Sequence, residues 1–109
     1  MKKVIYIAGP MSGIPDFNYP AFNAAEQQLL EHGWTVLNPV SSEQENTGDY
    51  QQQPWVWYLT RAIRLLTFAN SVALLPGWEN SKGAKLEKHV AESLGYDIRP
   101  IRKWMYGSR

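Results

Sequence analysis

Short runs typical of strands, the first of them nearly continuously apolar, alternate along this chain with longer segments of helical periodicity. The runs lie at 3–8, 34–37, 71–75 and 98–101. A strand that is apolar on both faces is typical of a parallel sheet covered by helices, and strands separated by helices predict right-handed βαβ units. We therefore expect an α/β fold. The pattern indicates a small Rossmann/flavodoxin-like three-layer sandwich with a parallel sheet of roughly four to five strands.

Three segments between or after these runs have the features of helices. The first spans about 18–32, where Asn18 suits the N-cap position. The second begins near Pro54, which suits the first helical position, and the third spans about 81–94. Residues 40–53 are polar and contain acidic but no basic side chains. We expect a long loop there, and loops of that length are commonly functional. A basic tail follows the last strand.

The size and composition of the chain exclude several classes of protein. Its 109 residues predict a single domain over 1–109 with one core. No apolar run approaches the roughly 20 residues of a membrane helix, and the start lacks a signal-peptide pattern, so we expect a cytoplasmic protein without a membrane partner. The net charge of +1 argues against a nucleic-acid polymer as partner. The lack of cysteine and of a metal-ligand pattern around the histidines predicts no metal, and we expect no cofactor.

Glu87 is the residue that points most clearly to chemistry. On the period of the third helix a carboxyl group lies within an apolar stripe, because Glu87 shares one face with Ala84, Val90, Ala91 and Leu94. Charged groups are almost never fully buried without a partner or a purpose. Two interpretations stay open: a functional carboxyl group, or a boundary glutamate that pairs with Lys88 or Arg64.

Two loops leave strands and lead into helices, which is where parallel α/β folds bind ligands. The loop at 77–83 brings Ser81 to a helix N-terminus, whose free N–H groups attract anions. Plain capping by Asn80 or Ser81 is the alternative, and both roles are compatible. The loop at 9–15 either presents backbone N–H groups to a ligand or is a tight turn. Tyr6 is either a core residue or a partner for a carboxyl group at the edge of the sheet.

Several segments resemble the nucleoside 2-deoxyribosyltransferase superfamily, which cleaves N-glycosidic bonds of nucleosides or nucleotides. The segments that carry the resemblance are Ile5–Gly13, Asn70–Trp78 and Ser81–Glu87. The chain is similar in particular to an uncharacterised branch common in phages and bacteria, which has a Pro-Gly-Trp-Glu signature like Pro76–Glu79. The resemblance covers nearly the whole chain and is weakest at 40–53.

The resemblance implies a role for each matching residue. Glu87 would attack the anomeric carbon of the sugar and form a glycosyl ester, and Tyr6 would orient it through a hydrogen bond. Ser81 would contact the 5′-phosphate. The remaining residues expected to bind the ligand come from the two loops: Gly9, Ser12, Gly13, Gly77, Glu79, Asn80 and Gly83.

Two positions depart from the superfamily's pattern. Ala62 follows Arg61 where relatives tend to carry an aspartate, and Asn70 stands where they often carry another. We therefore keep two hypotheses. The first is an enzyme for a small-molecule nucleoside or nucleotide: an N-glycosidase that cleaves the base–sugar bond of a (deoxy)nucleoside 5′-monophosphate, as a hydrolase or a deoxyribosyltransferase. The alternative is a catalytically weak nucleotide-binding or sensing module.

The chain has 5 tryptophans, many for its length. We expect Trp34 in the core, beside the second strand. Trp55, Trp57 and Trp78 are candidates for stacking a base or sealing an interface. Trp104, in the basic tail, is expected to contact another subunit. A chain this short has little spare length to cover its own pocket, so we expect a homo-oligomer, either a dimer or a tetramer.

Overall fold

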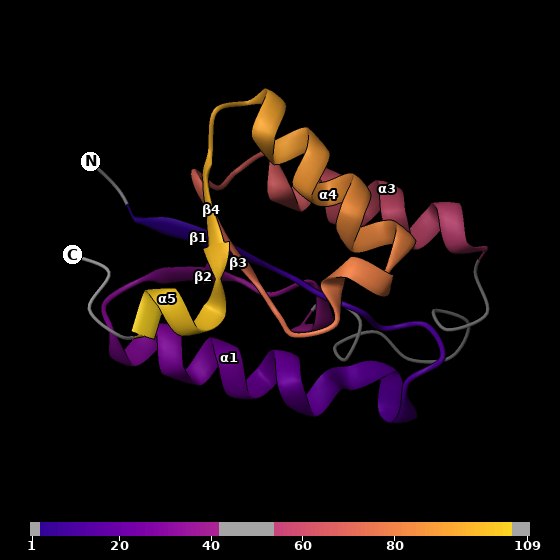
Figure 1. Cartoon of the computed structure of the whole chain (residues 1–109), viewed down its shortest axis with the longest axis horizontal. Helices are drawn as coiled ribbons and strands as arrows, with labels where there is room; N and C mark the ends of the chain where they lie inside the picture. The colour runs from indigo at the N-terminus through magenta and orange to yellow at the C-terminus, as the bar shows by residue number, and fades with distance from the viewer. Residues whose placement is uncertain (1–2, 42–53, 106–109) are drawn as a thin grey trace.

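The computed structural model describes residues 3–41 and 54–105 (Figure 1). Its strands are β1 (Val4–Ala8), β2 (Thr35–Leu37), β3 (Ser71–Leu74) and β4 (Asp97–Pro100). Its helices are η1 (Pro15–Asn18), α1 (Tyr19–Glu31), α3 (Trp55–Leu66), η3 (Trp78–Asn80), α4 (Lys82–Ser93) and α5 (Ile101–Met105). The expected alternation of strands and helices is confirmed. The loop expected at 40–53 lies outside the described residues except at its first two positions.

The strands of the described residues form one parallel sheet in the order β2–β1–β3–β4. β1 pairs with both of its neighbours, so that Ile5 lies opposite Val36 of β2 and Ser71 of β3. β3 in turn pairs with β4, with Ser71 opposite Asp97. The chain moves from β1 to β2 on one side and returns to β3 on the other. The order therefore reverses between β1 and β3, whose carboxyl ends are neighbours.

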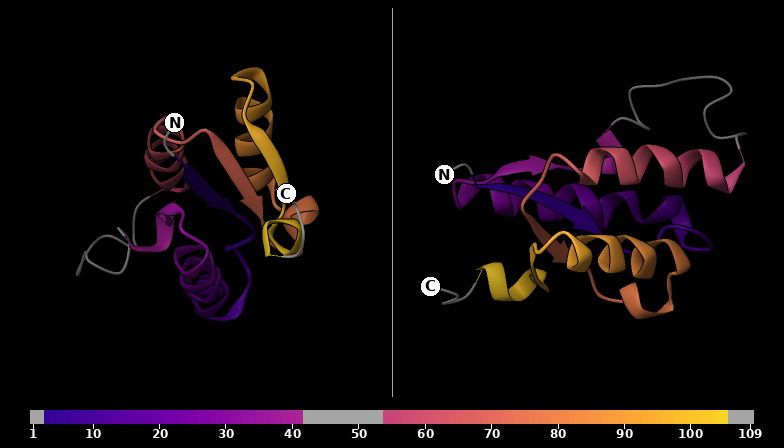
Figure 2. Two further views of the ribbon diagram at one scale, coloured as in Figure 1. Left: turned by 90° about the vertical axis from the view of Figure 1, so that its left-hand side faces the viewer. Right: turned by 90° about the horizontal axis from the view of Figure 1, so that it is seen from above.

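Helices cover both faces of the sheet, as Figure 2 shows, which confirms the three-layer α/β fold. The side chains of β1 alternate between the two faces. Ile5 and Ile7 belong to the cluster that contains α1 and Trp104. Tyr6 and Ala8 belong to the opposite cluster, which contains residues of α3 and α4. A side chain at position 6 therefore points toward α4.

The start of α1 differs from the prediction in one respect. Asn18 occupies the N-cap position as expected, but its side-chain amide donates to the carbonyl of Pro10 at 3.0 Å. Asp16, Phe17 and Asn18 all have positive φ angles, between 51° and 62°. A backbone that is left-handed at these three residues turns the Asn18 side chain toward the preceding loop, away from the first N–H groups of the helix.

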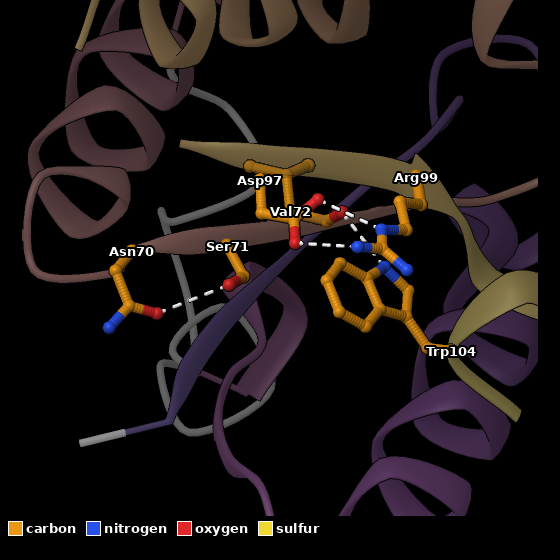
Figure 3. A network of polar contacts seen from close by, with 6 residues as sticks. All are labelled: Asn70, Ser71, Val72, Asp97, Arg99 and Trp104. Atoms are coloured by element: carbon orange, nitrogen blue, oxygen red, sulfur yellow. Dashed lines mark hydrogen bonds and ion pairs between the residues drawn. The ribbon is translucent and has the colours of Figure 1, made fainter. Parts of the chain in front are cut away.

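Trp104 corrects one prediction. The residue lies in α5, which was expected to be an irregular basic tail, and it is a core residue that is only 8% exposed. Its indole N–H donates to the carbonyl of Val72 in β3 at 3.0 Å, and the guanidinium of Arg99 lies over its ring (Figure 3). Trp34 meets it edge to face with ring centroids 5.0 Å apart. The expected subunit contact at Trp104 is wrong because the chain turns back after β4 and packs α5 against the sheet and α1.

Replacing Trp104 by phenylalanine is expected to lower the free energy of unfolding by about 1–3 kcal/mol. The shorter ring keeps most of the apolar contact but leaves the buried Val72 carbonyl without its donor. Urea denaturation of both proteins would measure the difference. Phe68→Leu, at an aromatic residue that is 72% exposed, is the control and should leave stability within about 0.5 kcal/mol. An unchanged midpoint for Trp104→Phe would contradict the prediction.

None of the helices in residues 3–41 and 54–105 is long and apolar enough to cross a bilayer.

Candidate active site

The loops that leave β1 and β3 are in direct contact. The N–H of Leu75 donates to the carbonyl of Ala8 at 2.9 Å, which continues the pairing of the two strands beyond their ends. A Cβ atom placed on Gly9 would lie 2.8 Å from the Cβ of Leu75, closer than real Cβ atoms approach. Glycine is therefore required at position 9 for this close approach.

A cavity of about 750 Å³ opens at the loop after β1 and is bounded by α3 and the start of α4. This is the carboxyl edge of the sheet, where such folds bind ligands. Six of the predicted site residues line the cavity: Gly9, Ser12, Asn80, Ser81, Gly83 and Glu87. The structure thus brings the two predicted loops and the glutamate together.

Glu87 is buried on the inner face of α4 with 8% of its surface exposed. Its Oε2 accepts a hydrogen bond from the hydroxyl of Tyr6 at 3.0 Å. Glu87 also lines the cavity, so a buried carboxyl group held by Tyr6 borders the space where a ligand would lie. Lys88 pairs with Glu92 on the surface of the helix. The interpretation of Glu87 as a boundary residue paired with Lys88 is therefore wrong, and its partner is Tyr6.

Burial changes the acidity of this carboxyl group. Loss of solvation raises the pKa of Glu87 from an ordinary value of 4.5 to about 8, although the hydrogen bond from Tyr6 acts in the opposite direction. The protein therefore holds this carboxyl group mostly protonated at pH 7. A strongly shifted pKa within a cavity is a feature of catalytic groups, although structural carboxyl groups also show it.

The N-terminus of α4 faces the same cavity. Ser81 is its N-cap, and its Oγ accepts from the N–H of Ala84 at 3.1 Å, so the predicted capping is confirmed. Ser81, Lys82 and Gly83 all line the cavity, and the ammonium of Lys82 lies 5.1 Å from the ring centroid of Trp55. Free N–H groups, a helix dipole and a lysine together favour an anion at this point.

The charge of the cavity lining is positive. Among the described residues that line it, Arg61, Arg64 and Lys82 are basic and Glu87 is the one acidic residue. Ala62, the first departure from the superfamily's pattern, also lines the cavity and supplies no carboxylate there. The cavity therefore presents three cations, and a carboxyl group that is largely neutral at pH 7, to an anionic ligand.

Some predicted residues lie elsewhere. Among the described lining residues, Gly13, Gly77 and Glu79 do not occur. Gly13 is an exposed residue of a turn, and Glu79 is exposed in η3. Gly77 has a φ of +88°, and a Cβ there would lie 3.3 Å from the Cγ of Pro10. Its role is therefore to allow the turn after β3 and its close approach to the loop after β1. Asn70 accepts from the hydroxyl of Ser71 at the beginning of β3, at the opposite edge of the sheet (Figure 3).

The sequence analysis missed most of the contribution of α3. Residues three or four positions apart on this helix line the cavity along its length: Trp55, Tyr58, Leu59, Arg61, Ala62, Arg64 and Leu65. From the sequence, the apolar stripe at Leu59, Ala62, Ile63 and Leu66 predicts only packing, yet Leu59 and Ala62 of that stripe also line the cavity. Of the tryptophans considered for stacking, Trp55 lines the cavity, whereas Trp57 packs under the guanidinium of Arg61 and Trp78 packs against the core.

A comparison with known protein families identifies the family of this chain. Residues 3–99 match a family described as a domain of unknown function, DUF4406. The chain belongs to the DUF4406 family. The match runs from the start of β1 into β4, so every element that builds the cavity of this DUF4406 domain lies within it. No curated protein matches the sequence.

Proposed function

We propose that this DUF4406 protein is an N-glycosidase that cleaves the base–sugar bond of a (deoxy)nucleoside 5′-monophosphate. The observation that carries the proposal is Glu87, a buried carboxyl group that lines a cationic cavity and accepts a hydrogen bond from Tyr6. The superfamily resemblance of the segments that contain both residues supports the same chemistry. The proposal includes a cytoplasmic location and a homo-oligomeric state.

The proposed reaction has two steps, formation of a glycosyl ester on Glu87 and its hydrolysis. The ionised carboxylate of Glu87 attacks C1′ of the sugar, and the C1′–N bond breaks with its electron pair moving to the base, which takes a proton from solvent. The product is a glycosyl ester on Glu87. Water then attacks C1′, the ester bond breaks, and the carboxylate and the free sugar phosphate are released with one proton. In a transferase, a second base takes the place of water.

In this proposal, the start of α4 binds the 5′-phosphate. Ser81 and Lys82 flank the free N–H groups of this helix. A phosphate bound there would leave the sugar beside Glu87, one to two helical turns further along α4. The aromatic ring of Trp55, which lines the same cavity, offers a flat surface for stacking.

Incubation with the set of deoxynucleoside 5′-monophosphates is expected to release free base, detected by chromatography. Replacing Ser81 by alanine should lower kcat/KM for the monophosphates by about tenfold and have little effect on the corresponding nucleosides, because the hydroxyl serves the phosphate. Ser93→Ala, at the far end of the same helix, is the matched control. Absence of base release from every monophosphate and nucleoside would refute the proposal.

A second candidate is a nucleotide-binding or sensing module. Two observations favour it: Glu87 is largely protonated at pH 7, and Ala62 provides no second carboxylate in the cavity. Calorimetry separates the two candidates. Tight nucleotide binding without base release, at pH 7 and at pH 9, would support the module, whereas turnover that grows at pH 9 would support the enzyme.

A further inference from the structure

Cationic side chains occur at two separate places along the cavity. Lys82 lies at the start of α4, and its contact with Trp55 shows that the first turns of α3 and α4 are adjacent. Arg61 and Arg64 follow Trp55 by six and nine residues on α3, which at 1.5 Å per residue corresponds to about 9 and 13 Å along the helix. All three cations line the cavity. The backbone positions of the two places are therefore separated along the helices by more than the width of one phosphate group.

Along the two helices, Glu87 lies nearly level with Arg61 and short of Arg64. It follows Lys82 by five residues, about 7–8 Å along α4. α3 and α4 lie side by side and run in the same direction, as Figures 1 and 2 show. Along the two helices, the level of Glu87 is therefore closer than the level of Arg64 to that of Lys82. A sugar held with C1′ at Glu87 would have Lys82 on one side and Arg64 on the other, with Arg61 close to its own level.

We propose that the ligand carries two phosphate groups on opposite sides of its sugar, as a nucleoside 3′,5′-bisphosphate does. This inference rests on the proposed function, which places the 5′-phosphate at Ser81 and Lys82. Arg61 and Arg64 then bind the 3′-phosphate. Guanidinium groups match the geometry of phosphate oxygens and form paired, charge-assisted hydrogen bonds with them.

The arrangement disfavours a nucleoside 5′-diphosphate. Both of its phosphates extend from the same side of the sugar, so neither reaches past Glu87 toward the arginines. The position of Arg61 is supported by its stacking over the ring of Trp57, with the guanidinium carbon 4.7 Å from the ring centroid. Arg64 lies one turn further along the same helix, so the two guanidinium groups face one stretch of the cavity.

Calorimetry with three nucleotide forms of each base tests the inference: the 5′-monophosphate, the 5′-diphosphate and the 3′,5′-bisphosphate. The diphosphate and the bisphosphate carry the same number of phosphate groups, so their comparison separates position from charge. We expect the bisphosphate to bind about tenfold or more tightly than the other two at near-physiological salt. Arg64→Gln should lower the ratio of monophosphate to bisphosphate Kd several-fold, with Arg61 supplying the remaining preference, whereas Lys82→Gln should weaken all three ligands.

The inference has a matched control, and several results would contradict it. Arg102→Gln, at an exposed arginine of α5 that is absent from the described cavity lining, should change no affinity. Equal binding of monophosphate and bisphosphate, preference for the diphosphate, or an unchanged ratio in Arg64→Gln would each overturn the second phosphate site and leave the proposed function standing. Failure of all three nucleotide forms to bind, together with no base release, would overturn both.

Discussion

Replacing Glu87 by glutamine is expected to lower kcat/KM for base release by about a thousandfold or more. The amide keeps the size of the side chain and can still accept from the Tyr6 hydroxyl, but it cannot attack C1′ as a carboxylate does. The measurement is the initial rate of base release at pH 9, where the wild-type carboxyl group is mostly ionised.

The control for this substitution lies on the same helix. Glu92 is an exposed residue that pairs with Lys88, so Glu92→Gln removes only a solvent-screened surface ion pair and should leave the rate unchanged. Activity of Glu87→Gln within tenfold of the wild type, with Glu92→Gln also active, would contradict the role of Glu87 as nucleophile.

The same substitution has a second expected effect, on stability. The carboxyl group of Glu87 has a pKa of about 8 in the folded protein and an ordinary value of 4.5 without burial, so the folded state holds the extra proton between these values. The free energy of unfolding of the wild type therefore falls as the pH rises from about 4.5 to 8, by up to several kcal/mol. Glu87→Gln cannot lose a proton there and should show a much smaller decline.

Urea denaturation of both proteins between pH 5 and pH 9 measures this difference. Glu92→Gln is again the control, because the pKa of the exposed Glu92 carboxyl is lowered by Lys88 and that group does not titrate in this range. A wild-type free energy of unfolding that stays level from pH 5 to pH 9 would show that ionising Glu87 does not destabilise the fold. That result would contradict the raised pKa of this carboxyl group.

The fold could be predicted from the sequence because its two central strands, β1 and β3, are buried on both faces. The runs at 4–8 and 72–75 are apolar apart from the hydroxyl of Tyr6, and a buried parallel strand is the arrangement that such runs favour. The end of the chain was less readable. α5 is short and carries two basic residues beside Trp104, so its local sequence resembles a tail, and only the contact with Val72 makes it part of the core.

The candidate site, too, could be predicted only in part from the sequence. Glu87 was identified from its position in an apolar stripe, and the loop at Ser81 from the chemistry of a helix N-terminus. The arginines of α3 gave no local signal, because a basic residue on a helix is normally a solvated one. Their relevance depends on which side of α3 faces the cavity, and that is decided by the packing of α3 against α4 and β1.

Base release is expected to become faster as the pH rises toward about 8 and then to level off. The nucleophile must be ionised, and kcat/KM reports the ionisation of the free enzyme, so the rate should grow about tenfold per pH unit below the pKa of Glu87. Measurement between pH 7 and pH 10 keeps the substrate phosphate, with its second pKa near about 6, in one charge state. A rate that instead falls across this range would show that the protonated carboxyl group is the active form, acting as a general acid.

Tyr6→Phe should move this profile to higher pH. The Tyr6 hydroxyl donates to Glu87 and lowers its pKa, so its removal leaves the effect of burial unopposed and fewer carboxylates ionised at pH 7. Tyr96→Phe is the matched control, since it also removes a hydroxyl hydrogen bond, but one to the carbonyl of Leu66 and not to Glu87. A reduced rate in Tyr6→Phe with an unmoved inflection would assign Tyr6 to the positioning of the carboxyl group alone, because a change in geometry lowers the plateau without moving the pKa.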